Sequence, residues 1–414
     1  MCKKNEKCFI CGNSNLIEVI DLGIQALTGV FPKEKGQKVT EGPLKLVKCM
    51  GNENVCGLLQ LQHAYSLDEM YGDNYGYRSG LNKSMVVHLD RIVEKIQRTI
   101  PLEKDDLVID IGSNDSTLLQ AYSQSNLLLV GIDPTGKKFK DYYPDHIHLI
   151  PDYFSAESVR KNFADKKAKV ITSIAMFYDL ESPMDFMRQV YDVLADDGIW
   201  VFEQSYMPTM LEMNAYDTIC HEHLEYYGLK QIKWMTDRIG FKIINIELSS
   251  ANGGSFLVKV AKSNAPYREN TRLVEKILRE EKTKELDQIK PYEAFKKNIY
   301  NHREELKRFI KKIKLENKII LGYGASTKGN VILQFCNFTE HDIPCIAEVN
   351  PDKFGRFTPG TGIPIISEEE AKTRNPDYLM VLPWHFKENI LEKERGYLKS
   401  GGKLVFPLPT IKVY

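Results

Sequence analysis

The sequence predicts an α/β protein of several domains, and three observations support this fold class. The chain has 414 residues, more than one ordinary hydrophobic core accommodates. Short apolar segments alternate with helical ones over residues 107–202, as in a parallel, doubly wound sheet. A second strand, glycine turn and helix start at residues 318–329 predict another such unit. We expect three domains, residues 1–75, 76–264 and 265–414.

Charge and hydropathy exclude some classes of function. Lysine plus arginine number 56, as do aspartate plus glutamate, so no net charge attracts nucleic acid or an anionic membrane. The N-terminus lacks the apolar run of a signal peptide, and no segment reaches the roughly 18 apolar residues of a membrane span. We therefore expect a cytoplasmic protein without nucleic-acid or membrane partners, either a monomer or a homodimer.

Five of the eight cysteines lie within the first 56 residues, and four of these five are candidate metal ligands. Cys8 and Cys11 have the spacing that lets both sulfurs reach one tetrahedral ion, with Gly12 at the turn. Cys49 and Cys56 are separated by six residues, a looser spacing than usual. Eight cysteines are too few for a disulfide scaffold in so long a chain. The four predict a structural zinc ion that serves folding, with ordinary buried thiols as the alternative.

Apolar spacing predicts the elements of the middle domain. A helix over residues 82–100 has its apolar side chains on one face and ends before Pro101. The last two expected strands are joined by a glycine turn without a helix between them, and this terminal hairpin is typical of the S-adenosylmethionine (SAM) methyltransferase sheet. The expected strands are residues 107–112, 127–133, 147–150, 168–174, 198–202, 241–248 and 255–261.

The turn after the first of these strands favours SAM over a nicotinamide dinucleotide. It has one glycine, Gly112, where a dinucleotide-binding turn has three. Asp110 and Asp115 would repel a pyrophosphate but tolerate a sulfonium. Asp133 ends the next strand, where an acid can accept both ribose hydroxyls. The expected cofactor-binding residues are Asp110, Gly112, Asn114, Asp115, Asp133, Asp152, Tyr153 and Phe154, the last three being placed to hold an adenine.

Residues 217–227 concentrate groups that can transfer protons: two imidazoles, a thiol, carboxylates and phenols. Methylation of a carbon needs a carbon nucleophile, which forms when a base removes a proton beside a ketone. With a pKa gap on the order of ten units, that step is uphill by roughly 14 kcal/mol. A base alone is insufficient, so hydrogen-bond donors must meet the developing enolate oxygen. The candidate donors are His221, Tyr226 and Tyr206.

The third domain begins with a charged helical pair at residues 266–315, followed by the second nucleotide-type unit. Backbone amides after Gly324, together with Lys328, suit a diphosphate. The glycine spacing is not that of a dinucleotide site, so a mononucleotide is favoured. NAD stays possible, because Glu348 ends the second strand of this unit.

Several motifs occur together along nearly the whole chain. They are the cysteine-rich start, Tyr75-Gly-Tyr77-Arg78-Ser79, Asp110-Ile-Gly112-Ser-Asn114-Asp115, Glu203-Gln204, Cys220-His221-Glu222-His223, Asn252-Gly253-Gly254-Ser255, Gly322-Tyr323-Gly324-Ala-Ser-Thr-Lys328 and Pro351-Asp352-Lys353. In combination they resemble the three-domain SAM-dependent C-methyltransferases that act on nucleotide-linked 4-keto-6-deoxyhexoses at C3.

The resemblance implies an N-terminal zinc-binding domain, a central class I SAM methyltransferase domain of Rossmann-like fold, and a C-terminal Rossmann-like α/β domain that helps to bind the nucleotide sugar. It implies that His223 is the base and that Glu222 assists it, by orienting its imidazole. His221 and Cys220 complete the candidate catalytic set. A tyrosine usually stands at the position of Cys220, which we interpret as a packing or pocket-lining thiol.

The expected reaction is methyl transfer from SAM to the carbon beside the ketone, as in branched deoxysugar biosynthesis, on a TDP- or GDP-linked sugar. Two alternatives stay open: an NAD-dependent oxidoreductase acting on a nucleotide sugar, and an inactive member of the fold. The candidate substrate-binding residues are Tyr75, Tyr77, Arg78, Ser79, Asp179, Tyr206, Asn252, Gly253, Arg303, Tyr323, Lys328, Glu348 and His385.

Overall fold

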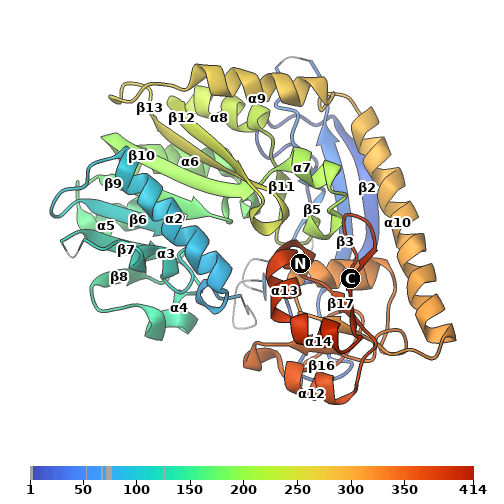
Figure 1. Cartoon of the computed structure of the whole chain (residues 1–414). Helices are drawn as coiled ribbons and strands as arrows, with labels where there is room; N and C mark the ends of the chain where they lie inside the picture. Colours follow the sequence, from blue (N-terminus) through green and yellow to red (C-terminus); the bar gives the residue numbers. More distant parts are fainter. Residues whose placement is uncertain (1–2, 53, 67–68, 71–76, 125) are drawn as a thin grey trace.

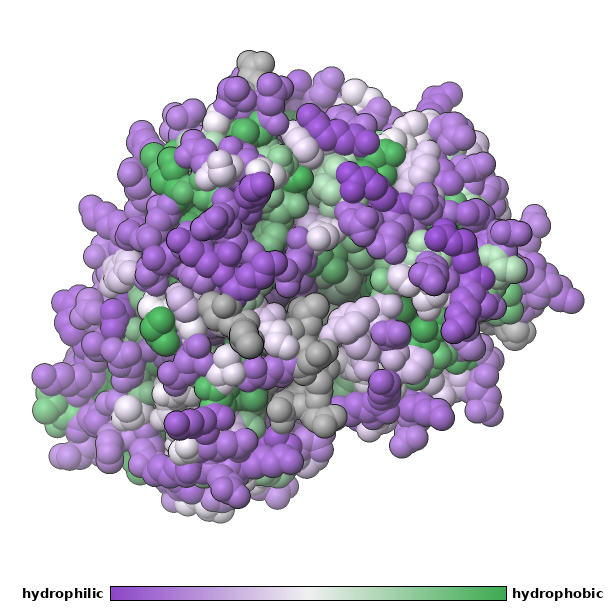
Figure 2. Space-filling model, turned by 180° about the vertical axis from the view of Figure 1, so that it is seen from behind, coloured by the Kyte–Doolittle hydropathy of each residue, from purple (hydrophilic) through white to green (hydrophobic). Residues whose placement is uncertain are grey.

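The structure, a computed structural model, describes residues 3–52, 54–66, 69–70, 77–124 and 126–414. It contains a seven-stranded sheet, a six-stranded sheet and a smaller four-stranded sheet whose core residues pack against both (Figure 1). Within the described residues, no helix combines the length and apolar surface needed to cross a bilayer. Hydrophilic side chains dominate the face in Figure 2, with hydrophobic ones set in a hollow near its middle.

The seven-stranded sheet has the strand order β12-β13-β10-β9-β6-β7-β8. Neighbouring strands from β10 to β8 run parallel, whereas β13 is antiparallel to both β10 and β12. The predicted α/β sheet and its terminal hairpin are therefore confirmed. The strands are β6 (Leu107–Ile111), β7 (Leu128–Ile132), β8 (Ile147–Ile150), β9 (Ala168–Ile174), β10 (Leu194–Ser205), β12 (Phe241–Ser249) and β13 (Ser255–Lys262).

Helices cover both faces of this sheet, which explains why its central strands are apolar throughout. All five residues of β6 are buried, as expected for a parallel strand with both faces covered. On one face lies α2 (Lys83–Thr99), whose N-cap Asn82 accepts a hydrogen bond from the amide of Ser84. The other helices of this region are α3 (Thr117–Gln120), α4 (Gly136–Phe139), α5 (Ala156–Phe163), α6 (Pro183–Val193), α7 (Met207–Glu212) and α8 (Leu229–Ile239).

The four-stranded sheet takes its last strand from the middle of the chain. Its order is β11-β4-β3-β2, and β11 pairs with β4 through Glu225 and Gln60. The N-terminal segment therefore completes its sheet with residues that directly follow His223. The strands are β2 (Leu16–Ala26), β3 (Glu41–Cys49), β4 (Leu59–Leu61) and β11 (Glu225–Tyr226), beside a two-stranded sheet of β1 (Lys3–Lys4) and β5 (His63–Ala64).

The expected helical pair is α9 (Thr271–Thr283) and α10 (Lys290–Leu315). In Figure 1, α10 runs along the outer side of the molecule past β2, and the hydroxyl of Tyr300 donates to Asp21 O at 2.7 Å there. One hydrophobic core joins the N-terminal sheet to the C-terminal unit. The domain boundaries at residues 75 and 264 stay predictions.

The six-stranded sheet has the order β16-β15-β14-β17-β18-β19, with β14 between β15 and β17. Those three strands are parallel. Among the described strands of this sheet, only the terminal β19 is antiparallel to its neighbour. The strands are β14 (Ile320–Tyr323), β15 (Ile346–Glu348), β16 (Ile365–Ser367), β17 (Tyr378–Val381), β18 (Lys403–Phe406) and β19 (Lys412–Val413). The helices are α11 (Thr327–Phe335), α12 (Glu368–Thr373), α13 (Lys387–Lys393) and α14 (Arg395–Lys399).

Each large sheet has a point where the chain reverses its direction of winding. In the first it lies at β6, between β7 and β9, and in the second at β14, between β15 and β17. Ligands of open α/β sheets bind at the carboxyl ends of strands at such points. The fold therefore offers two ligand sites, at the turns after Ile111 and after Tyr323.

Candidate active site

Four cysteine sulfurs gather as the sequence predicts. The Sγ atoms of Cys8, Cys11, Cys49 and Cys56 all lie within 4.8 Å of one another. The Sγ atoms of Cys8 and Cys56 are 3.4 Å apart, and those of Cys11 and Cys49 are 3.6 Å apart. Zinc–sulfur bonds of about 2.3 Å in a tetrahedron place sulfurs about 3.8 Å apart. The donor set therefore fits a zinc ion, with no open position for catalysis.

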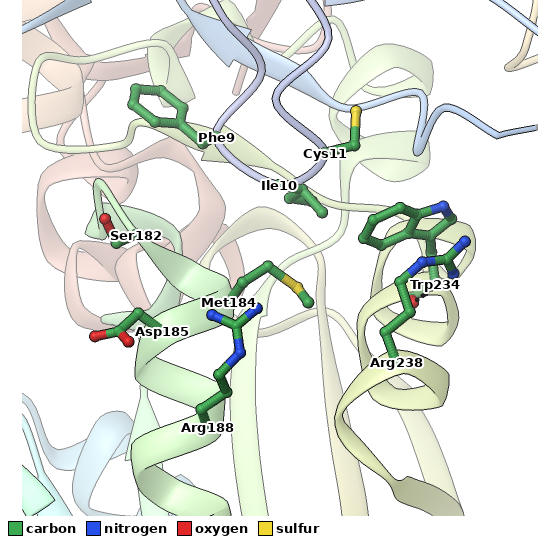
Figure 3. A pocket seen from close by; sticks show the side chains of 9 residues that line it. All are labelled: Phe9, Ile10, Cys11, Ser182, Met184, Asp185, Arg188, Trp234 and Arg238. Carbon is green, nitrogen blue, oxygen red and sulfur yellow. Dashed lines mark hydrogen bonds between the residues drawn. The ribbon is translucent and has the colours of Figure 1, made fainter.

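A surface hollow of about 450 Å³ lies beside these cysteines (Figure 3). The figure shows Phe9, Ile10 and Cys11 at one side, with side chains of α6 and α8 below and beside them. None of its lining residues belongs to the predicted catalytic set. The candidate active site therefore lies elsewhere, at residues 217–227 and at the two strand-end turns.

The turn after β6 is tied to the end of β7. Gly112 has a φ of +76°, which lets the chain leave the strand in the left-handed region. Asp133 then accepts hydrogen bonds from the amides of Asn114 and Thr135, both at 2.7 Å. Burial raises the pKa of Asp133, and these bonds oppose the shift. A buried carboxylate at this strand end suits the ribose of SAM.

Asp110 is the last residue but one of β6, and its assignment to SAM stays a prediction. It is buried within β6, and burial raises its pKa to about 7 although Thr172 donates a hydrogen bond at 2.6 Å. Asp152 and Tyr153 follow β8 and are exposed. Phe154 is half-buried, and its ring centroid lies 5.2 Å from that of Phe186. Their assignment to the adenine stays a prediction.

A predicted substrate-binding segment folds over the predicted cofactor turn. The amides of Ser79 and Gly80 donate to the side chains of Asn114 and Asp115, each at 2.9 Å. Arg78 lies 3.7 Å from Asp115 Oδ2 and stacks on the ring of Tyr142. Tyr77 contributes its carbonyl oxygen to Asn114 at 3.2 Å. Tyr75, predicted to bind substrate, lies outside the described residues.

The imidazole of His223 is held in one tautomer by a backbone carbonyl. Its Nδ1 lies 2.9 Å from Thr218 O, and because a carbonyl only accepts, Nδ1 carries the proton and Nε2 a lone pair. Burial lowers the pKa of His223 to about 3, and the positive charge of Lys328 adds to the shift. The ring of Tyr178 lies against it, with centroids 4.3 Å apart. His223 is therefore neutral and able to accept a proton at neutral pH.

Glu222 has other partners than the imidazole that we expect it to orient. The hydroxyl of Thr28 donates to its Oε2 at 3.0 Å, and Asn330 of α11 donates to the carbonyl oxygen of Thr28 at 2.7 Å. Burial raises the pKa of Glu222. Thr28 therefore links Glu222 to α11, and the orienting contact to His223 comes from Thr218.

His221 and Cys220 lie in the core. The ring of His221 is fully buried and packs edge-on against Tyr65, with centroids 4.7 Å apart. Burial lowers its pKa to about 4, which the nearby backbone of Gly42 partly offsets, although neither ring nitrogen has a hydrogen-bond partner among the described residues. Burial, and then the charge of Glu222, raise the pKa of the Cys220 thiol. Cys220 is therefore a protonated packing residue here.

The C-terminal unit contributes Trp384 and Lys328 to this region. The indole Nε1 of Trp384, in η7 (Trp384–Phe386), donates to Oδ2 of Asp217 at 2.7 Å. Lys328 lies in the first turn of α11. Burial lowers the pKa values of His223 and His385, and the charge of Lys328 adds to both shifts. Burial raises the pKa of Asp217, and the charge of Lys328 opposes that rise. The ammonium group of Lys328 is thus near all three.

Three residues of this region were not selected from the sequence: Asp217, Thr218 and Trp384. Sequence motifs consist of side chains that lie near one another in the sequence. Thr218 acts through its backbone carbonyl, and Trp384 reaches Asp217 from 167 positions away. The density of polar groups at residues 217–227 was the one available signal for Asp217.

Several predicted substrate-binding residues have other partners. The hydroxyl of Tyr206 donates to Glu281, and that of Tyr323 to Glu394, each at 2.8 Å. Arg303 stacks on Phe335 at the C-terminal end of α11, opposite the end that carries Lys328. Arg303 therefore lies away from the His223 region, and the hydroxyls of Tyr206 and Tyr323 are engaged in structural hydrogen bonds.

Other predicted residues lie closer to the His223 region. Asp179 ends η3 (Phe177–Asp179), and its charge contributes to the raised pKa of Cys220. Gly253, in η5 (Ala251–Gly253), packs against Trp384 and His385. Asn252 belongs to the same turn, but its side chain is outside the described part of the structure. Tyr226 OH lies 3.4 Å from Thr218 O, the carbonyl that holds His223.

Comparison with protein families places three matches along the chain. Residues 8–71 match the domain described as "Putative zinc binding domain". Residues 87–246 match the domain described as "Methyltransferase domain", and residues 250–409 the one described as "C-methyltransferase C-terminal domain". The cysteine cluster lies within the first match and His223 within the second.

Individual proteins are similar as well. The C-methyltransferase NovU from Streptomyces niveus is 27% identical over 412 residues, which cover 99% of this chain and 96% of that protein. The plantazolicin methyltransferase BpumL in complex with SAH has a TM-score of 0.34 and 14% identity over 42% of this chain and 82% of its own. The YcgJ protein from Bacillus subtilis has a TM-score of 0.33 and 14% sequence identity, and the match covers 42% of this chain and 98% of YcgJ.

Proposed function

We propose that this chain, a SAM-dependent C-methyltransferase by its domain matches and its similarity to NovU, methylates a nucleotide-linked 4-keto-6-deoxyhexose at C3. One observation carries the proposal. The carbonyl of Thr218 fixes the tautomer of His223 whose Nε2 can remove a proton. The C-methyltransferase matches favour this reaction over that of an NAD-dependent oxidoreductase.

His223 performs the first step by taking a proton from the carbon beside the ketone. Its low pKa makes it a weak base, so the step depends on stabilising the enolate that forms. The positive charge of Lys328, which acts on the pKa of His223, is a source of such stabilisation, and its effect grows as negative charge develops on the ketone oxygen. The enolate in turn favours the imidazolium, because opposite charges at short range support one another.

SAM, when bound at the carboxyl end of β6, supplies the electrophilic methyl group. Asp133 is the residue that we assign to its ribose, and Asn114 and Asp115 shape the turn around it. The N-terminus of α11, in the second sheet, favours the diphosphate of the sugar nucleotide. The zinc ion supports the fold through the sheet that ends in β11.

The test separates proton removal from methyl transfer. The protein is incubated with SAM and with freshly prepared TDP- and GDP-linked 4-keto-6-deoxyhexoses, and mass spectrometry detects a product heavier by one methyl group. In a parallel sample, SAH replaces SAM and deuterium oxide replaces water, so deuterium enters the sugar next to its ketone if a base acts. Deuterium exchange without methylation shows that a base acts on the sugar and leaves the acceptor of the methyl group open. Neither signal from any sugar, with SAM bound, refutes the proposed substrate class.

A further inference from the structure

Asp217 has one carboxylate oxygen in use and one without a partner. Its side chain is fully buried, at 0% exposed. Oδ2 accepts the hydrogen bond from Trp384, whereas Oδ1 has no hydrogen-bond partner among the described residues. Burial raises the pKa of this carboxyl, whereas the charge of Lys328, the hydrogen bond from Trp384 and the nearby backbone amides oppose the rise and favour the charged form. The amide of Thr218 donates to Ala215 O at 3.1 Å. By hydrogen-bond geometry, Oδ1 is therefore an acceptor that no group among the described residues satisfies.

Such an atom is costly in a folded protein. A buried polar group left without its hydrogen bond costs about 1–3 kcal/mol, and more when it carries charge. Buried oxygens of this kind are usually met by water, an ion or a ligand. A carboxylate oxygen can only accept, so the missing partner must present a donor. A hydroxyl or a protonated amine meets that requirement.

The position of Asp217 relates this oxygen to the reacting carbon. Asp217 and Thr218 belong to the same turn, η4 (Tyr216–Thr218), and Thr218 holds the imidazole of His223. The charge of Lys328 acts on both Asp217 and His223. On the facing segment, Nδ1 of His385 is a second buried atom without a partner among the described residues. Two buried polar atoms without a partner among the described residues thus belong to side chains that, like His223, feel the charge of Lys328.

We propose that Asp217 is a specificity-determining residue whose Oδ1 accepts a hydrogen bond from a hydroxyl or protonated amino group on the sugar ring, beside the carbon that His223 deprotonates. The proposal rests on the sugar-nucleotide methyltransferase function and adds to it a requirement for a donor on the substrate. The hydrogen bond from Trp384 occupies Oδ2 and leaves Oδ1 for the substrate.

The test compares substrates that differ by one donor. For the full-length protein, kcat/KM is measured for a keto-deoxyhexose nucleotide and for its analogues that lack the C2 or the C3 hydroxyl. A site built around a substrate donor discriminates strongly against the analogue without it. We expect the wild type to prefer one hydroxylated substrate over its matched analogue by about 100-fold or more, and Asp217→Asn to reduce that preference to about tenfold or less.

Trp384→Phe is the control variant, because it removes the donor to Oδ2 and leaves the carboxylate in place. It should lower activity on both substrates and keep the preference. An equal loss of preference in Trp384→Phe and Asp217→Asn would assign Asp217 to holding the two segments together and overturn the proposal. Unchanged SAM affinity and unchanged Tm show that each variant is folded. If Asp217→Asn does not fold, a wild type that treats both substrates equally still overturns it.

The two proposals can fail separately. Methylation of the sugars without any preference for a donor refutes the role of Asp217 and supports the function. Absence of methylation and of deuterium exchange with every sugar refutes the function, and the role of Asp217 as stated is refuted with it.

Discussion

Asp133 and Glu348 make the same contact in two different sheets. Oδ2 of Asp133 accepts from the amide of Asn114 at 2.7 Å, and Oε2 of Glu348 accepts from the amide of Ala325 at 2.7 Å. Each acid stands at the end of the second strand of its unit and closes the turn that follows the first strand. Because the carboxylate fixes the turn by accepting a hydrogen bond from a backbone amide, the turn needs fewer glycines than that of a dinucleotide site.

A matched pair of variants tests whether these turns serve two ligands. Asp133→Asn should weaken SAM binding by about tenfold or more, because an amide cannot accept from every donor around it, and should leave the affinity for TDP or GDP unchanged. Glu348→Gln should show the opposite pattern. Isothermal titration with SAM and with each nucleotide distinguishes them. Loss of both affinities in either variant would indicate a single shared site.

Replacement of His223 tests the base. His223→Gln should reduce methyl transfer and deuterium exchange by at least about 100-fold, the usual effect of losing a general base, with SAM affinity unchanged. The matched control is His341→Gln, which alters an exposed histidine of the C-terminal unit and should have no effect. Exchange that survives in His223→Gln would move the base to another residue.

The buried His221 makes stability depend on pH. Its pKa is lowered to about 4 by burial, so the unfolded chain binds a proton that the folded chain does not between about pH 4 and 6.5. Stability contributed by this group is present above pH 6.5 and is lost as the pH falls, at about 1.4 kcal/mol per pH unit. His221→Phe should show a shallower decline of unfolding free energy from pH 6.5 to 5 in denaturant titrations. Equal slopes for wild type and variant would contradict this.

Gly29 lies where a side chain would collide with Glu222. A Cβ at this position would lie well inside van der Waals distance of Glu222 Oε1, and Glu222 is buried and bonded to Thr28. Gly29→Ala should therefore destabilise the protein by about 1–3 kcal/mol. Gly396→Ala is the control, since nothing lies within 4 Å of a Cβ there and the residue is helical. Thermal melts of both variants give the comparison.

Removal of zinc should affect activity as well as folding. From the sequence alone we would assign the metal only to the stability of the first 70 residues. The structure connects this segment to the site, because β4 pairs with β11 and Thr28 bonds to Glu222. We expect Cys8→Ser to lower Tm and to reduce methyl transfer. Cys345→Ser, which changes a buried cysteine outside the cluster, should leave zinc content unchanged in metal analysis.

Local structure, and the kinds of reactive side chain that the protein contains, could be predicted from the amino-acid sequence alone. Apolar runs located the seven strands of the larger sheet and the strand that opens the six-stranded one, since the period of a strand depends on neighbouring residues. Cysteine spacing indicated the zinc site, and the four sulfurs lie together. The glycine turns and the acids at the strand ends were also predicted, because turn conformation and strand ends are set within a few residues.

The contact partner of each side chain in the site became known only from the three-dimensional structure. His221 and His223 are two positions apart in the sequence. His221 packs against Tyr65 of the N-terminal part, whereas His223 packs against Tyr178 and has its pKa lowered by the charge of Lys328 as well as by burial. Glu222 bonds to Thr28, and Asp217 to Trp384, 194 and 167 positions away. Burial and long-range contacts set the protonation and direction of these groups. Sequence spacing does not encode such contacts, because they arise when separate segments pack together.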